Sequence, residues 1–167
     1  MVILVDTEDN PIGTASKIDA HRRGLLHRAV SVLLFNSRNE LLIQRRAASK
    51  YHSGGLWANS CCSHPAVGEP VARAAERRLR EELGISARLH HLRTFIYRAR
   101  LDRGMVEHEL DHVFVGRSDR VPAPDPAEIS DWRYVSLPCV CEDMRLHPEL
   151  YAVWFRIMLC GYEHGER

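Results

Sequence analysis

The segment from Pro70 to Leu83 predicts an amphipathic helix. Its apolar residues return every fourth position and so share one helical face: Val71, Ala75, Leu79 and Leu83. Pro70 suits a first helical position, and Gly84 suits the left-handed residue that follows a last turn. Whatever fold this chain adopts must therefore bury one side of this helix against other elements.

Runs of alternating apolar and β-branched residues lie on both sides of this helix. They predict strands at residues 2–5, 29–35, 41–45, 93–98, 106–115 and 132–135, with a turn at residues 36–39. Two further helices are predicted, a short one at residues 138–146 and a longer one from Pro148 to about Cys160. Strands mixed with helices predict an α/β or α+β fold, in which a mixed β-sheet is sandwiched between helices.

The size and charge of the chain limit its organisation and its partners. A length of 167 residues fits one domain, residues 1–167. The net charge of +1 gives no electrostatic reason to expect nucleic acid or an acidic membrane as a partner. No apolar window reaches the roughly 18 residues of a membrane span, and the first residues lack the layout of a signal peptide. We expect a cytoplasmic monomer whose five cysteines are thiols rather than a disulfide framework.

Two glutamates interrupt the strand predicted at residues 106–115. Glu107 and Glu109 share one face of that strand with their Cα atoms about 7 Å apart, so both carboxylates can approach one cation. His108 and His112 fall on the opposite face and are left out of the site. The simpler alternative is that Glu107 and Glu109 are solvated positions on an edge strand.

Histidines are the available partners for these carboxylates. Each of His21, His27 and His64 could be an ordinary hydrogen-bonded residue, so only their combination points to a metal site. Three imidazoles and two carboxylates would form a mixed nitrogen and oxygen sphere, which suits Mn²⁺, Mg²⁺ or Zn²⁺ better than a structural four-thiolate zinc site.

Several motifs, in this order over most of the chain, resemble those of the type I isopentenyl-diphosphate isomerases, which share the Nudix fold. The motifs are Lys17-x-x-x-His21, the segment ending in His27, Arg45-Arg46-Ala47-Ala48-Ser49-Lys50, Trp57-Ala58-Asn59-Ser60-Cys61-Cys62-Ser63-His64-Pro65, Arg77-Arg78-Leu79-Arg80-Glu81-Glu82-Leu83-Gly84, Phe95-Ile96-Tyr97-Arg98-Ala99 and Glu107-His108-Glu109. The resemblance implies a Nudix-like fold and an isomerase of isoprenoid biosynthesis that interconverts isopentenyl and dimethylallyl diphosphate through a carbocation. A small-molecule diphosphate would be its partner.

The resemblance also implies roles for individual residues. Cys62 and Glu109 match the catalytic pair, and Tyr97 is expected to hydrogen-bond near Glu109. Trp154, and less strongly Trp57, are candidates to shield the carbocation that forms on the substrate, although both could be ordinary core aromatics. The positions that match binding residues are His21, His27, His64, Glu107 and Glu109 for the metal, Glu82 for Mg²⁺ on the diphosphate, and Lys17, Arg46 and Lys50 for the phosphates.

The chain departs from related patterns at two places that matter. Arg78 stands where the Nudix hydrolase box has a glutamate, which weakens the alternative of a Nudix-type pyrophosphohydrolase. The spacing between His21 and His27 is one residue shorter than in the isomerase pattern. A non-enzymatic metal-binding module is a third possibility, but the chain lacks the paired C-x-x-C knuckles of such modules.

Overall fold

The computed structural model describes residues 1–163 of the chain. Its strands are β1 (Val2–Val5), β2 (Pro11–Ala15), β3 (His27–Phe35), β4 (Glu40–Arg46), β5 (Trp57–Ala58), β6 (Cys61–Ser63), β7 (Leu89–Arg100), β8 (Val106–Arg117) and β9 (Ile129–Ser136). Its α-helices are α1 (Lys17–Arg23), α2 (Val71–Leu83), α3 (Leu137–Leu146) and α4 (Val153–Glu163), with short 3₁₀ turns at Asp102–Gly104 and Pro148–Leu150.

The strands form one mixed sheet with β3 at its centre. β3 pairs in parallel with β8 and antiparallel with β1, β4 and β6, while β7 pairs with β8 and β9 pairs with β4. The parallel register places His27 opposite Glu109, and the antiparallel register of β7 places Tyr97 opposite the same glutamate. The sheet therefore brings three distant segments of the sequence to one point.

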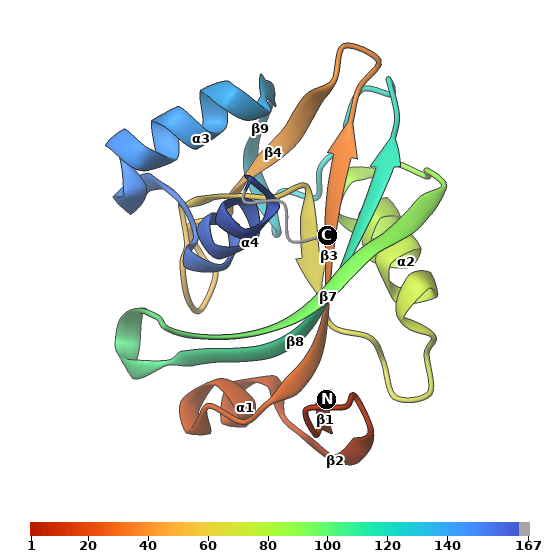
Figure 1. Cartoon of the computed structure of the whole chain (residues 1–167), viewed down its shortest axis with the longest axis vertical. Helices are drawn as coiled ribbons and strands as arrows, with labels where there is room; N and C mark the ends of the chain where they lie inside the picture. The colour runs from red at the N-terminus through yellow and green to blue at the C-terminus, as the bar shows by residue number, and fades with distance from the viewer. Residues whose placement is uncertain (164–167) are drawn as a thin grey trace.

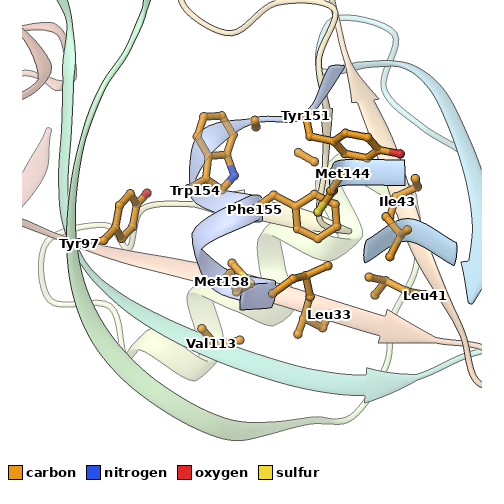
Figure 2. Close-up of a cluster of buried hydrophobic side chains, with 14 residues drawn as sticks. Leu33, Leu41, Ile43, Tyr97, Val113, Met144, Tyr151, Trp154, Phe155 and Met158 are labelled. Carbon is orange, nitrogen blue, oxygen red and sulfur yellow. The ribbon is translucent and has the colours of Figure 1, made fainter. Parts of the chain in front are cut away.

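Helices cover both faces of this sheet, with α2 on one side and α3 and α4 on the other (Figure 1). Side chains alternate along β3 accordingly: Leu33 packs in the cluster beneath α3 and α4, whereas Val32 and Leu34 pack in the cluster beneath α2. Figure 2 shows the first cluster, in which Phe155 and Met158 of α4 contact the sheet. The predicted mixed sheet between helices is confirmed.

Most predicted elements are present and longer than predicted. All six predicted strands exist, and α2 ends at Gly84, whose φ of 66° is left-handed. Pro70 caps α2 from the position before its first residue rather than from within it. The sequence did not predict α1, β2, β5 or β6, because these elements have at most seven residues and no apolar period long enough to recognise.

The predicted helix from Pro148 to Cys160 is wrong at its start. After the 3₁₀ turn the chain straightens at Tyr151, which forms an isolated parallel bridge with Trp57. The amide of Ala152 then donates a hydrogen bond of 2.8 Å to the carbonyl of Trp57. Because this sheet-like pairing interrupts the helical hydrogen bonds, α4 begins only at Val153.

No helix within residues 1–163 combines the length and the apolar character that crossing a membrane would require.

Candidate functional site

Four side chains that are distant in sequence converge at the start of β3. His21 of α1, His27 of β3, His64 just after β6 and Glu109 of β8 offer ligand atoms that all lie within 4.8 Å of one another. The Oε1 atom of Glu109 lies 2.9 Å from His64 Nε2 and 3.4 Å from His27 Nε2. His21 thus reaches the group despite its shortened spacing to His27.

Backbone carbonyls fix the orientation of two of these imidazoles. His21 donates from Nδ1 to the carbonyl of Lys17 at 2.6 Å, and His27 donates from Nδ1 to the carbonyl of Leu25 at 2.8 Å. In both rings Nε2 is then the nitrogen that points into the group. Metal-binding histidines commonly have this arrangement, in which one ring nitrogen is anchored and the other is free to coordinate.

The protonation states of these side chains also favour the binding of a metal cation. Burial lowers the pKa of His21, and it lowers the pKa of His64 to about 3, so both rings are neutral near pH 7. Burial acts to raise the pKa of Glu109, but the contacts of its carboxylate with the imidazoles of His27 and His64 outweigh it and hold that pKa well below its usual range. Neutral imidazoles and an ionised carboxylate are the forms that bind metals.

Glu107 extends this group toward a second set of ligand atoms. Its Oε2 atom lies 3.4 Å from His21 Nε2, and both atoms are buried without a hydrogen bond. His21, His52 and Glu107 form a further group whose ligand atoms lie within 4.8 Å of one another. Burial, followed by the charge of Glu109, raises the pKa of Glu107. Buried polar atoms without partners are costly unless something satisfies them, and a divalent cation would do so here.

The residues predicted to move protons face one small cavity. Cys62, Tyr97 and Glu109 all line a cavity of about 30 Å³ that adjoins the histidines. The hydroxyl of Tyr97 donates a hydrogen bond of 2.6 Å to Oε2 of Glu109. Burial raises the pKa of Cys62 to about 12, so this side chain is a neutral thiol that carries its proton near pH 7. The neighbouring Cys61 points the other way, into the core beneath α2.

Trp154 also lines this cavity. It lies at the start of α4, where its ring stands at the border of the core cluster on the side of Tyr97 (Figure 2). The guanidinium of Arg46 lies 5.1 Å from the centre of the Trp154 ring, and Arg46 also lines the cavity. Trp57 does not line it, and instead packs beneath Arg133 at 4.5 Å. Trp154 is therefore the aromatic residue of the two that can contact a ligand here.

The residues predicted to hold a diphosphate are divided between two places. Lys17 and Arg46 line the cavity. Lys50 and Glu82 do not, and each forms an ion pair: Lys50 with Glu128, and Glu82 with Arg78 at 2.5 Å. Arg78 also lies 3.6 Å from Glu128, so these four residues form one charged network beside α2.

Two residues of this region were not predicted. Asp111 follows Glu107 and Glu109 on the same face of β8 and is only 1% exposed. The alternation of the strand, continued by two residues beyond Glu109, would have predicted this position. His52 lies in the loop between β4 and β5 and lines the cavity. No motif or spacing in the sequence connects His52 with Glu107, so only the folded chain brings it to the site.

Comparisons with known proteins agree with this geometry. Residues 25–154 match the NUDIX domain family. The chain is 51% identical to isopentenyl-diphosphate Delta-isomerase 2 of Aromatoleum aromaticum, over 98% of this chain and 89% of that protein. It is 49% identical to isopentenyl-diphosphate Delta-isomerase of Pectobacterium atrosepticum, over 93% of this chain and 87% of that protein.

Solved structures of other proteins share this fold at lower sequence identity. The crystal structure of DR0079 from Deinococcus radiodurans has a TM-score of 0.80 at 22% identity, covering 99% of both chains. A MutT protein from Methanosarcina mazei has a TM-score of 0.70 at 18% identity, covering 85% of this chain and 96% of that one. These similarities concern the fold alone. Taken with the sequence identities, they show that this chain belongs to the NUDIX-domain family and, within it, to the isopentenyl-diphosphate Delta-isomerases.

Proposed function

We propose that this chain interconverts isopentenyl diphosphate and dimethylallyl diphosphate by adding one proton to the substrate and removing another. The observation that carries this proposal is that Cys62 and Glu109 line one cavity beside the histidine and glutamate group. Moving the double bond from the 3,4 to the 2,3 position needs a proton donor at C4 and a proton acceptor at C2. Two proton-carrying side chains at one cavity meet that need.

Glu109 and Cys62 are the two proton-transfer groups of this proposal. A proton added to C4 leaves a tertiary cation at C3, and loss of a proton from C2 to the other residue completes the new double bond. The hydrogen bond from Tyr97 fixes the position of the Glu109 carboxyl. Which residue gives the first proton depends on the direction of the reaction, because the two directions use the same path in reverse.

The cation at C3 needs a cover that does not react with it. The ring of Trp154 is the proposed cover, since an aromatic face attracts a desolvated cation by about 2 kcal/mol or more. Its burial, at 3% exposure, also excludes water, which would otherwise trap the cation as an alcohol. In the structure the guanidinium of Arg46 lies near that ring, so a positive charge already rests beside Trp154.

The proposed metal ligands are His21, His27, His64, Glu107 and Glu109, and Mn²⁺, Zn²⁺ or Mg²⁺ fits this mixed set. When bound, such a cation makes a coordinated carboxyl group a stronger acid, because it stabilises the anion that remains. The chain contributes the rest of the chemistry by holding Glu109 between His64, His27 and Tyr97.

The diphosphate would bind at the basic side of the cavity. Lys17 and Arg46 line it, and both can form charge-assisted hydrogen bonds to phosphate oxygens. Lys50 can join them by leaving Glu128, because a partly exposed ion pair is worth at most about 1 kcal/mol. Glu82 is the proposed contact for Mg²⁺ on the diphosphate.

We further propose that residues 1–167 act as one catalytic domain, as a cytoplasmic monomer whose partner is this small diphosphate.

Hydrolysis of a diphosphate is less consistent with the charged network. Arg78 donates hydrogen bonds to Glu81 at 2.7 Å and to Glu82 at 2.5 Å. Arg78 itself stands where the Nudix hydrolase box has a glutamate, so this position offers a cation in place of a metal-binding carboxylate. The purified protein should release no phosphate from nucleoside diphosphate derivatives under conditions in which it isomerises isopentenyl diphosphate.

The direct test is to incubate the protein with isopentenyl diphosphate and Mg²⁺ and to follow dimethylallyl diphosphate by NMR. Cys62→Ala and Glu109→Gln should each lower the rate at least about 100-fold, as is typical for loss of a proton-transfer group. Cys61→Ala is the matched control, because this neighbouring thiol points away from the cavity. A near wild-type rate in either test variant would remove that residue from the mechanism.

A further inference from the structure

His52 lies at the proposed metal site although none of the motifs includes it. The side chain is buried, and its ring stacks on that of His21 with centroids 5.2 Å apart and planes 28° apart. Its Nε2 atom lies 3.6 Å from Oε1 of Glu107, which is too far for a hydrogen bond. His52 therefore approaches the same carboxylate as His21 without being satisfied by it.

The two ligand groups of this site share His21. One group contains His27, His64 and Glu109 with His21, and the other contains His52 and Glu107 with His21. Because Nδ1 of His21 bonds the carbonyl of Lys17, only Nε2 remains to coordinate, and one lone pair binds one ion. The two groups are thus two parts of one coordination sphere rather than two independent sites.

The dimensions of each group by itself suit part of such a sphere, and their shared residue, His21, joins the two parts. Ligand atoms on opposite sides of an octahedral ion lie about 4 Å apart, because each bond is about 2.1 Å long. The atoms of each group lie within 4.8 Å of one another, and the groups together contain six different residues. Six ligands are the number that an octahedral ion takes.

We propose that Nε2 of His52 is a sixth protein ligand of the cation, beside His21, His27, His64, Glu107 and Glu109. This inference rests on the metal site of the proposed function and extends it. Four imidazoles and two carboxylates fill an octahedral sphere, so the cation acts on the substrate through Glu109 and not through a bound water. A sphere with four nitrogens also favours Mn²⁺, Co²⁺ or Zn²⁺ over Mg²⁺, which prefers oxygen.

The competing interpretation is that His52 only packs. Its ring makes edge contacts with Tyr51 and Trp154 as well as stacking on His21, and a phenylalanine could reproduce all three. His52→Phe therefore separates the two interpretations, since it keeps the aromatic packing and removes the ligand. His52→Gln is a second variant that keeps a polar side chain, for use if the phenylalanine variant does not fold.

The test measures metal binding rather than turnover. Metal-free wild type and His52→Phe are titrated with Co²⁺ and with Zn²⁺ against a competing chelator, and the visible spectrum of the Co²⁺ form is recorded. His91→Phe, at an exposed histidine of β7, is the matched control. Loss of His52 should raise the dissociation constant at least about tenfold. It should also turn the weak absorption of six-coordinate Co²⁺ into the stronger absorption of a five-coordinate ion, with no change in the control.

Each other result counts against the proposal. Wild-type affinity and spectrum in His52→Phe would show that this residue only packs. Weaker binding with an unchanged Co²⁺ spectrum would make His52 a positioning residue and not a ligand. If the wild type itself binds neither ion, the metal site of the proposed function fails together with this inference. If the wild type binds both ions and His52→Phe binds them equally well, only the inference fails.

Discussion

Glu109 is a proposed metal ligand and a proposed proton-transfer group, and several contacts hold its carboxylate in place. It receives hydrogen bonds on both carboxylate oxygens, from His64 at 2.9 Å on Oε1 and from Tyr97 at 2.6 Å on Oε2. A carboxyl held at both oxygens cannot rotate away from the cavity, so in the proposed mechanism it would exchange a proton along one direction. Tyr97 bonds Glu109 from β7, on the opposite side of β8 from His27.

Removing only the Tyr97 hydroxyl tests this positioning. Tyr97→Phe should lower kcat/KM about 10- to 100-fold, because a hydrogen bond to a charged group is worth about 1.5–3 kcal/mol. The control is Tyr134→Phe, whose hydroxyl bonds the carbonyl of Ser118 outside the cavity. Steady-state kinetics with isopentenyl diphosphate would contradict the role if both variants kept wild-type kcat/KM.

Residue types and strand alternation predicted much of the candidate site. Alternation alone puts Glu107 and Glu109 on one face, and the structure brings both beside His21, His27 and His64. His52 could not be found in this way, because its approach to Glu107 depends on how the loop between β4 and β5 folds over the sheet. Lys50 and Glu82 matched family positions, but sequence could not tell that Glu128 and Arg78 already pair with them.

At the scale of elements, long periodic segments were predictable and short ones were not. The helix α2 was found because its apolar face repeats over its 13 residues. By contrast, α1 has seven residues and is defined by its ends: Ser16 accepts from the amide of Asp19, and Gly24 takes a left-handed φ of 60°. The start of α4 depends on a bridge to Trp57, a contact distant in sequence that no local pattern contains.

The segment between β6 and α2 is held by Glu69. This carboxylate accepts two hydrogen bonds from Arg77 of α2, at 2.7 and 2.8 Å, and a third from the amide of Ala66. The segment begins with His64, so Glu69 also ties a proposed metal ligand to the helix. The hydrogen bonds from Arg77 lower the pKa of Glu69 to about 2.

Glu69→Gln should therefore destabilise the protein in a pH-dependent way. A lowered pKa means that the ionised form stabilises the fold above the unfolded value of 4.5, and that this contribution is lost as the pH falls toward about 2. We expect a loss of up to about 1 kcal/mol in the free energy of unfolding at pH 7, and no difference from wild type near pH 2. Urea unfolding across this range is the measurement.

The control for this experiment is Glu76→Gln, which removes an ion pair with Arg73 at 3.3 Å on the surface of the same helix. It should change the free energy of unfolding by only a few tenths of a kcal/mol. A constant difference between Glu69→Gln and wild type from pH 7 to pH 2 would mean that ionisation of Glu69 contributes nothing.

At the scale of the whole molecule, the proposed cation would tie the helix α1 and the segment after β6 to the paired strands β3 and β8. Its ligands come from α1, from the start of β3, from the segment after β6 and from β8. The helix α1 in particular lies apart from the two large cores, at the end of the molecule near β1 and β2 (Figure 1). An ion held by these segments would therefore stabilise the native state and have no matching site in the unfolded chain.

Removing the cation should accordingly lower the melting temperature. With metal at about 100 times its dissociation constant, binding contributes about 2.7 kcal/mol, which corresponds to roughly 5–10 °C for a chain of this size. Calorimetry of chelator-treated protein, with and without added Mn²⁺ or Zn²⁺, measures the difference. His64→Asn should abolish most of it, whereas His90→Asn, at an exposed position of β7, should retain it. If wild type melts at one temperature with and without the ions, the segments around His64 are held by protein contacts alone, and the proposed metal centre contributes nothing to the fold.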